Sequence, residues 1–187
     1  MKFKNFPNPQ EILTDIIKQS FGIERYAYII SEIHKRDISK DLDYQRTYNA
    51  FYVVRRDAKW RKIYFDYFEK QKNNKKLSFE EVIQYLYKQT GLVESSFSSK
   101  LLSTINPQMP IWDLYVLKNL GLETKVGKPL YKLEQSVRLY REINDYYLGL
   151  SESKWGKEVI ATFDKVLPSF KFISSVKKID FFIWKIR

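Results

Sequence analysis

The chain has 187 residues, of which 44% are hydrophobic and 17% are aromatic. This is enough apolar material for one folded domain with a full core, and it excludes a disordered basic tail. Lys and Arg number 33 against 22 Asp and Glu, a formal net charge of +11 that favours a polyanionic partner, with nucleic acid first and acidic lipid second.

Helices are predicted along the whole chain, because apolar residues recur mostly at intervals of three and four and only six glycines and six prolines occur. The first helix begins at Pro9, and Gly22 separates it from a second helix. Residues 43–72 form two consecutive helices with a break near Asp57. The pattern therefore predicts an all-α fold, and its length predicts a single compact multi-helix domain over residues 1–187.

A capping box opens the next helix, since Ser78 precedes the apolar run and Glu81 follows three residues later. This helix runs to about Gly91. Later helices are expected over residues 95–105, 113–120 with a stop at Gly121, 129–148, and from Lys154 to Pro168. Residues 174–187 form either a last helix, with an ion pair from Lys177 or Lys178 to Asp180, or a terminal strand over 181–186.

Several classes of site and location are excluded by composition. Cysteine is absent, which removes disulfides, thiolate nucleophiles, iron–sulfur clusters and thiolate zinc sites. The single histidine, His34, cannot build a metal site alone, so we predict neither metal nor cofactor. No window reaches the roughly 20 apolar residues of a membrane helix, and the first residues lack the apolar core of a signal peptide. We therefore expect a cytoplasmic protein with no membrane partner.

Basic side chains concentrate between residues 54 and 76, where nine Lys and Arg face three acidic residues and alternate with aromatic ones. One interpretation is a solvated helix face above an aromatic core stripe. The other is a nucleic-acid surface, because neutralised phosphates release counterions and give affinity without special geometry. The predicted phosphate contacts are Arg55, Arg56, Lys59, Arg61 and Lys62.

Asp113 lies directly behind Pro-Ile-Trp and directly ahead of an apolar run. It is either the N-cap of a helix, worth about 1 kcal/mol, or a carboxylate presented to a substrate. Trp112 and Tyr115 are the aromatic side chains beside it that could line a base pocket, and the alternative for both is packing in the core.

Residues 79–121 read as helix, tight turn at Gly91, helix, the loop NPQMPIW, and Asp113 opening another helix. This order resembles the helix-hairpin-helix DNA glycosylase superfamily, in which a hairpin of two helices is followed by a Gly/Pro-rich loop ending in an essential aspartate. The resemblance implies a DNA-glycosylase-like fold, double-stranded DNA as partner, Asp113 as the catalytic carboxylate and Gly91 as a backbone contact to phosphate.

Three departures from that family pattern shape the expected chemistry, and one of them is the missing cysteine-ligated cluster of the endonuclease III branch. Val93 stands where the hairpin usually has its second glycine, and Ser95 stands where bifunctional members carry a lysine that forms a Schiff base with the sugar. Lys100 lies more than one helical turn further on and cannot replace it. The resemblance thus implies a monofunctional N-glycosylase without a cluster. A non-catalytic nucleic-acid-binding module and a module for an acidic protein partner remain the alternatives.

Overall fold

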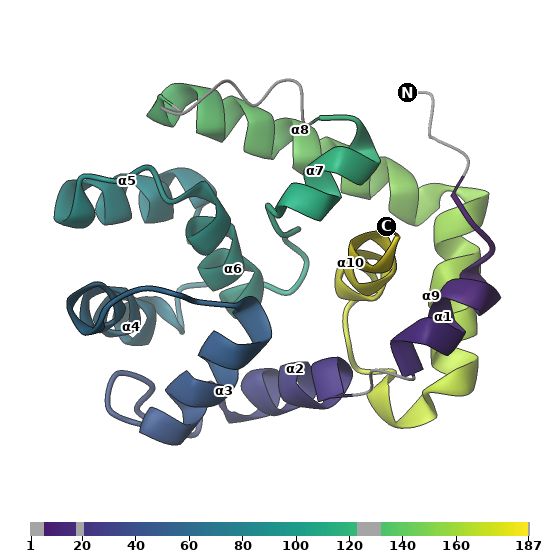
Figure 1. The fold of residues 1–187 in the computed structure, drawn as a ribbon, viewed down its shortest axis with the longest axis horizontal. Coiled ribbons are helices and arrows are strands. Elements are labelled where there is room, and N and C mark those ends of the chain that lie inside the picture. Colours follow the sequence, from purple (N-terminus) through teal and green to yellow (C-terminus); the bar gives the residue numbers. More distant parts are fainter. Residues whose placement is uncertain (1–5, 18–20, 123–131, 187) are drawn as a thin grey trace. The chain divides into compact units, whose positions relative to one another are not determined.

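The computed structural model describes residues 6–17, 21–122 and 132–186 (Figure 1). These residues form ten α-helices, one short 3-10 helix and no strand, which confirms the predicted all-α class. The helices divide between two compact units. The central unit is Ser20–Asn106, and the terminal unit combines Met1–Gln19 with Pro107–Arg187. The prediction of one domain over residues 1–187 stays a prediction.

Caps set several helix boundaries of the central unit. Its helices are α2 (Phe21–Glu32), α3 (Leu42–Tyr52), α4 (Ala58–Gln71), α5 (Phe79–Thr90) and α6 (Ser95–Ile105). Asp57 accepts the Trp60 N–H and begins α4, which confirms the predicted break. Ser78 and Glu81 form the predicted capping box at α5. Gly91 ends α5 at φ 71°, a left-handed conformation that favours glycine.

The aromatic residues of α3 and α4 form the core of the central unit. Tyr48 and Tyr64 are fully buried, and their hydroxyls lie 2.7 Å apart. Tyr64 donates its hydroxyl proton to the Phe97 carbonyl oxygen at 3.0 Å, so Tyr48 is the donor to Tyr64. Burial raises the pKa of both phenols well above the ordinary value, so both remain protonated donors. The aromatic stripe of residues 60–68 is therefore core material.

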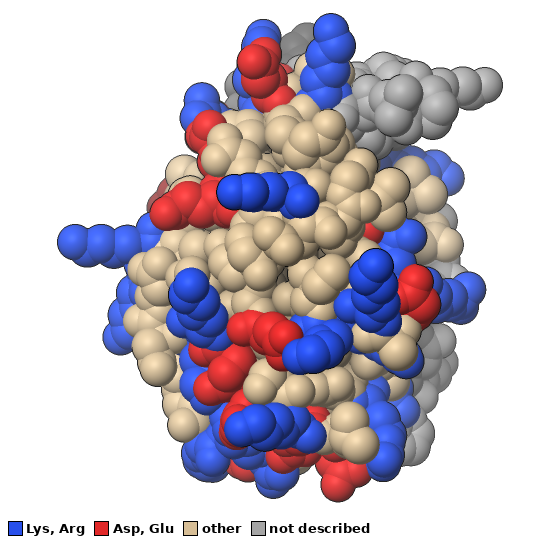
Figure 2. All heavy atoms as spheres, turned by 90° about the vertical axis from the view of Figure 1, so that its left-hand side faces the viewer, with Lys and Arg blue, Asp and Glu red and all other residues tan. Residues whose placement is uncertain are grey.

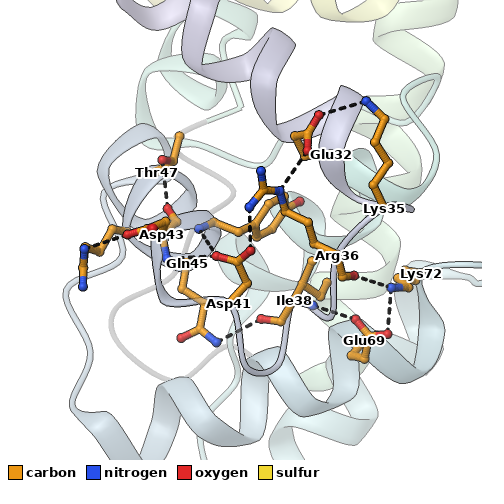
Figure 3. Close-up of polar contacts among 12 residues, drawn as sticks. Glu32, Lys35, Arg36, Ile38, Asp41, Asp43, Gln45, Thr47, Glu69 and Lys72 are labelled. Atoms are coloured by element: carbon orange, nitrogen blue, oxygen red, sulfur yellow. Dashed lines mark hydrogen bonds and ion pairs between the residues drawn. The ribbon is translucent and has the colours of Figure 1, made fainter.

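A network of ion pairs and hydrogen bonds stabilises the connection between α2 and α3 (Figure 3). Arg36 contacts Glu32 and Asp41, each at 2.8 Å. Lys72, the C-cap residue of α4, contacts Glu69 at 2.7 Å and donates to the Arg36 carbonyl oxygen at 2.7 Å. Hydrogen bonds from Lys35 and Arg36 lower the pKa of Glu32, and those from the Tyr44 N–H and Arg36 lower the pKa of Asp41. The network fixes the α2–α3 connection mainly when both carboxylates are ionised.

We expect this network to make the stability of the fold decrease as the pH falls through the acid range. The unfolded-state pKa is near 4.5 for Glu32 and near 3.8 for Asp41, and both are lower in the folded state. Each carboxylate therefore contributes its full stabilisation at a pH above its unfolded-state pKa. This stabilisation is lost as the pH falls through the folded-state pKa. Arg36→Gln should lower the melting temperature at pH 7 and flatten its decrease below pH about 4. Arg46→Gln is the control, because its ion pair with Asp43 is exposed. Equal melting curves for both variants across pH 3–7 would contradict the assignment.

The terminal unit contains α1 (Pro9–Ile17), α7 (Leu114–Leu120), α8 (Leu133–Glu152), α9 (Lys154–Val166), the 3-10 helix η2 (Pro168–Phe170) and α10 (Ser175–Lys185). The described part of the predicted 129–148 helix begins at Leu133 and runs on to Glu152, while residues 129–131 lie outside the described ranges. The strand predicted as an alternative for 181–186 is wrong. Ser174 caps α10, and its buried apolar residues fall at helical spacing.

Candidate functional site

Asp113 is the N-cap residue of α7. Its backbone is extended, with φ −136° and ψ 153°, and its Oδ1 accepts the Tyr115 N–H at 2.8 Å. The Asp113 carbonyl oxygen accepts the Leu117 N–H at 2.9 Å, which completes the first helical turn. Within the described residues the carboxylate makes this one hydrogen bond, and the side chain is only partly buried. The cap leaves Oδ2 able to bind a second group.

The two aromatic residues predicted beside Asp113 lie in different environments. Trp112 is 5% exposed and belongs to the core of the terminal unit, together with Ile111. Tyr115 is 38% exposed, and its ring meets that of Trp184 edge to face with centroids 6.2 Å apart. Of the predicted pair, Tyr115 is thus the one that reaches the surface, and the role of Trp112 in a base pocket stays a prediction.

Trp184 lies beside the predicted site residues although no motif in the sequence marks it. It belongs to the last turn of α10, about seventy residues after Tyr115, and α10 packs against α7. Asn119 joins the two helices, because its side-chain amide donates to the Ile183 and Ile186 carbonyl oxygens, each at 2.7 Å. The only sequence signal for Trp184 was an aromatic residue in a basic C-terminal stretch.

The predicted hairpin is present as α5, the turn at Gly91, and α6. Glu94 in the turn is 5% exposed, and both of its carboxylate oxygens contact Arg56 Nη2, at 2.8 and 2.9 Å. The Trp60 indole N–H also donates to Glu94, at 3.0 Å. Glu94 therefore ties the hairpin turn to the beginning of α4. No described atom lies within 4 Å of a Cβ added at Gly91, so its backbone angle is what favours glycine there.

The basic residues predicted to contact phosphate do not share one environment. Arg56 is held by Glu94 and lies over the rings of Trp60 and Phe97, at 5.7 and 5.4 Å. Lys62 pairs with Asp66 at 2.7 Å. Arg55 and Lys59 are exposed, Arg61 is partly buried, and none of these three has an ion pair among the described residues. Arg56 has a structural role that the sequence did not indicate.

Charges of both signs share the outer face of α4 and α5. One exposed side of α4 carries Lys59, Asp66 and Lys70. They lie on the same side because they are seven and four residues apart, which is close to whole turns of a helix. Figure 2 shows basic side chains distributed over this face, with acidic side chains among them. The arrangement is a mixed surface with a basic excess.

Lys100 is not positioned as a surface nucleophile. It is 9% exposed, its Nζ donates to the Tyr52 carbonyl oxygen at 3.0 Å, and it lies 5.2 Å from the centre of the Phe97 ring. Ser95, at the place of the family's lysine, is also buried. The hairpin belongs to the central unit, whereas Asp113 belongs to the terminal unit.

In the described part of the chain, no three or more His, Asp and Glu side chains gather where they could hold a metal ion. Among the same residues, no helix has both the length and the apolar character needed to cross a bilayer. In comparisons with protein-family models, with curated proteins and with solved structures, nothing matches this chain.

Proposed function

We propose that the protein binds double-stranded DNA and removes a base as a monofunctional N-glycosylase, with Asp113 as the catalytic carboxylate. The observation that carries the proposal is the Asp113 side chain. It follows a helical hairpin and a Pro-containing loop, it begins a helix, and its one hydrogen bond among the described residues leaves a carboxylate oxygen for a substrate.

The chemistry requires little beyond this carboxylate. Cleavage of an N-glycosidic bond builds positive charge on the deoxyribose, and a carboxylate close to the anomeric carbon stabilises that charge or directs a water molecule onto it. Ser95 offers no amine for a Schiff base, which favours hydrolysis without strand cleavage. The target base must leave the stack and be held by aromatic groups, and Tyr115 has the exposure that such a contact needs.

Binding to the DNA backbone would rely on the exposed lysines of α4. Each phosphate contact that is lost should reduce the slope of log K against log salt concentration by about 0.9. The double variant Lys59→Gln/Lys70→Gln should therefore weaken duplex binding and lower that slope by up to about 2. Lys154→Gln/Lys165→Gln on α9 removes the same charge from exposed positions and is the control. Fluorescence anisotropy at several salt concentrations measures both slopes, and an equal loss in the two variants would contradict a specific role for α4.

A non-catalytic binding module is the second candidate function. The observation that favours it is again at Asp113, because the hydrogen bond to the Tyr115 N–H explains this residue as a helix cap without any chemistry. In that case the basic surface would serve nucleic acid, or an acidic protein, with no reaction.

Anisotropy binding to a duplex with one central abasic-site analogue, beside the same duplex undamaged, separates these functions. Preference for the analogue supports an extruded nucleotide, and a panel of duplexes with damaged or mismatched bases then tests excision. Equal binding with a steep salt slope supports the binding module. Absence of binding to both duplexes would overturn the DNA proposal and favour an acidic protein partner.

A further inference from the structure

The loop that leads to Asp113 is held from two sides within the terminal unit. The Tyr140 hydroxyl on α8 donates to the Pro110 carbonyl oxygen at 2.8 Å. The Ser174 hydroxyl, at the N-cap of α10, donates to the Pro107 carbonyl oxygen. We name residues 107–112 the approach loop. Its two proline carbonyls are bound by side chains that lie 30 and 67 residues further along the chain.

These hydroxyls matter to the approach loop because two of its residues cannot donate a backbone hydrogen bond. Pro107 and Pro110 have no N–H to donate, and their rings restrict the backbone angles. Pro110, Ile111 and Trp112 are all buried, so the Pro110 carbonyl oxygen would be without a partner if Tyr140 did not reach it. The loop is therefore clamped by two long-range hydrogen bonds and three buried residues immediately before Asp113.

Tyr140 can keep its hydrogen bond to the Pro110 carbonyl oxygen over a wide pH range. Its side chain is buried, and burial, followed by the charge of Asp180, raises its pKa well above the ordinary value. The phenol thus stays protonated and donates to Pro110 at any pH at which the protein would act. Ser174 has a double role, since its oxygen also accepts the Lys177 N–H at 3.1 Å and so links the approach loop to the beginning of α10.

We propose that Tyr140 and Ser174 are positioning residues that fix the Asp113 carboxylate by clamping the approach loop. The proposal rests on the proposed glycosylase function and adds two residues to its site. Neither hydroxyl touches the carboxylate. Each holds a carbonyl oxygen three or six residues before it, and a displacement of about 1 Å at a catalytic group can cost about 100-fold in rate.

The test compares Tyr140→Phe with Tyr147→Phe in the full chain. Tyr147 is also a buried tyrosine of α8, but its hydroxyl donates to Asp180 and not to the approach loop. Three quantities are measured for each variant: amide hydrogen exchange over residues 111–117, single-turnover base excision at saturating DNA, and duplex affinity. The Tyr115 amide reports the Asp113 cap directly, because its N–H donates to Oδ1.

We expect Tyr140→Phe to speed exchange over residues 111–117 and to slow excision about 10- to 100-fold with unchanged duplex affinity. Tyr147→Phe should leave exchange over these residues and duplex affinity as in the wild type. It is a control for these two readouts only, because the charge of Asp113 also acts on the Tyr147 hydroxyl. Ser174→Ala should act like Tyr140→Phe, and Ser174→Thr, which keeps the hydroxyl, should restore both readouts. Exchange that is equal in Tyr140→Phe and Tyr147→Phe would overturn the clamp. If the wild type excises no base from the panel, the proposed function fails, while the exchange data still decide whether the two hydroxyls hold the loop.

Discussion

Replacement of Asp113 with asparagine should reduce base excision by about 100- to 1,000-fold, the usual cost of removing one charge-stabilising group from an active site. Duplex affinity and the melting temperature should stay close to those of the wild type. Asparagine is as good an N-cap as aspartate, so it can keep the hydrogen bond to the Tyr115 N–H while the negative charge is lost. Single-turnover excision, anisotropy and thermal unfolding measure the three quantities.

Asp57→Asn is the matched control for Asp113→Asn. Asp57 is likewise an N-cap aspartate, whose side chain accepts the Trp60 N–H at 2.8 Å, and its replacement should leave the excision rate unchanged. Asp113→Ala should lose about 1 kcal/mol of stability as well as activity, because alanine cannot cap the helix. Equal excision by the wild type and Asp113→Asn would show that Asp113 is a structural cap only.

Asp180→Ala should destabilise the fold by about 3–5 kcal/mol, the typical cost of breaking a buried ion pair from one side. Lys177 Nζ lies 2.8 Å from Asp180 Oδ2, and both side chains are 6% exposed. The Tyr147 hydroxyl donates to the other carboxylate oxygen at 2.6 Å. Removing Asp180 would take away the buried carboxylate that both the Lys177 ammonium and the Tyr147 hydroxyl contact.

Urea unfolding measures this loss. Glu134→Ala on α8 is the control, because the ion pair of Glu134 with Arg138 is exposed and should contribute about 0–1 kcal/mol. The double variant Lys177→Met/Asp180→Leu should recover most of the stability lost in Asp180→Ala, since a well-packed apolar pair can replace a buried ion pair. A loss below about 1 kcal/mol in Asp180→Ala would contradict the role assigned to the pair.

Helix boundaries could be predicted from the sequence because they depend on neighbouring residues. The Ser78 capping box and the break at Asp57 depend on side chains within a few positions of the backbone N–H groups that they accept from. The stop at Gly91 is equally local, because the backbone N–H of this left-handed glycine donates to the Tyr87 carbonyl oxygen. The helix over residues 95–105 also has the predicted bounds, although no side chain caps its start. The start of the predicted 129–148 helix lies partly outside the described residues, and that helix continues four residues beyond its predicted end.

Partners that lie far apart in the sequence could not be predicted in this way. The sequence offered Lys177 or Lys178 as the partner of Asp180, and only the structure distinguishes them, because Lys178 lies 2.6 Å from Asp164 on α9. The basic run of residues 54–76 gave no sign that Arg56 is bound to Glu94, 38 residues later. The packing of the helices decides which charged side chains are bound within the protein. The others remain available to a partner.

The sequence by itself determined the all-α class, the capping box at Ser78 and the position of Asp113 at the start of a helix. Only the tertiary structure decided that Tyr140 and Ser174 hold the approach loop, that Trp112 is buried and that Trp184 lies beside Tyr115. The physical reason is the range of the interactions. A cap forms within one helical turn, whereas a clamped loop or an aromatic contact requires segments far apart in the chain to be brought together by burial of their apolar faces.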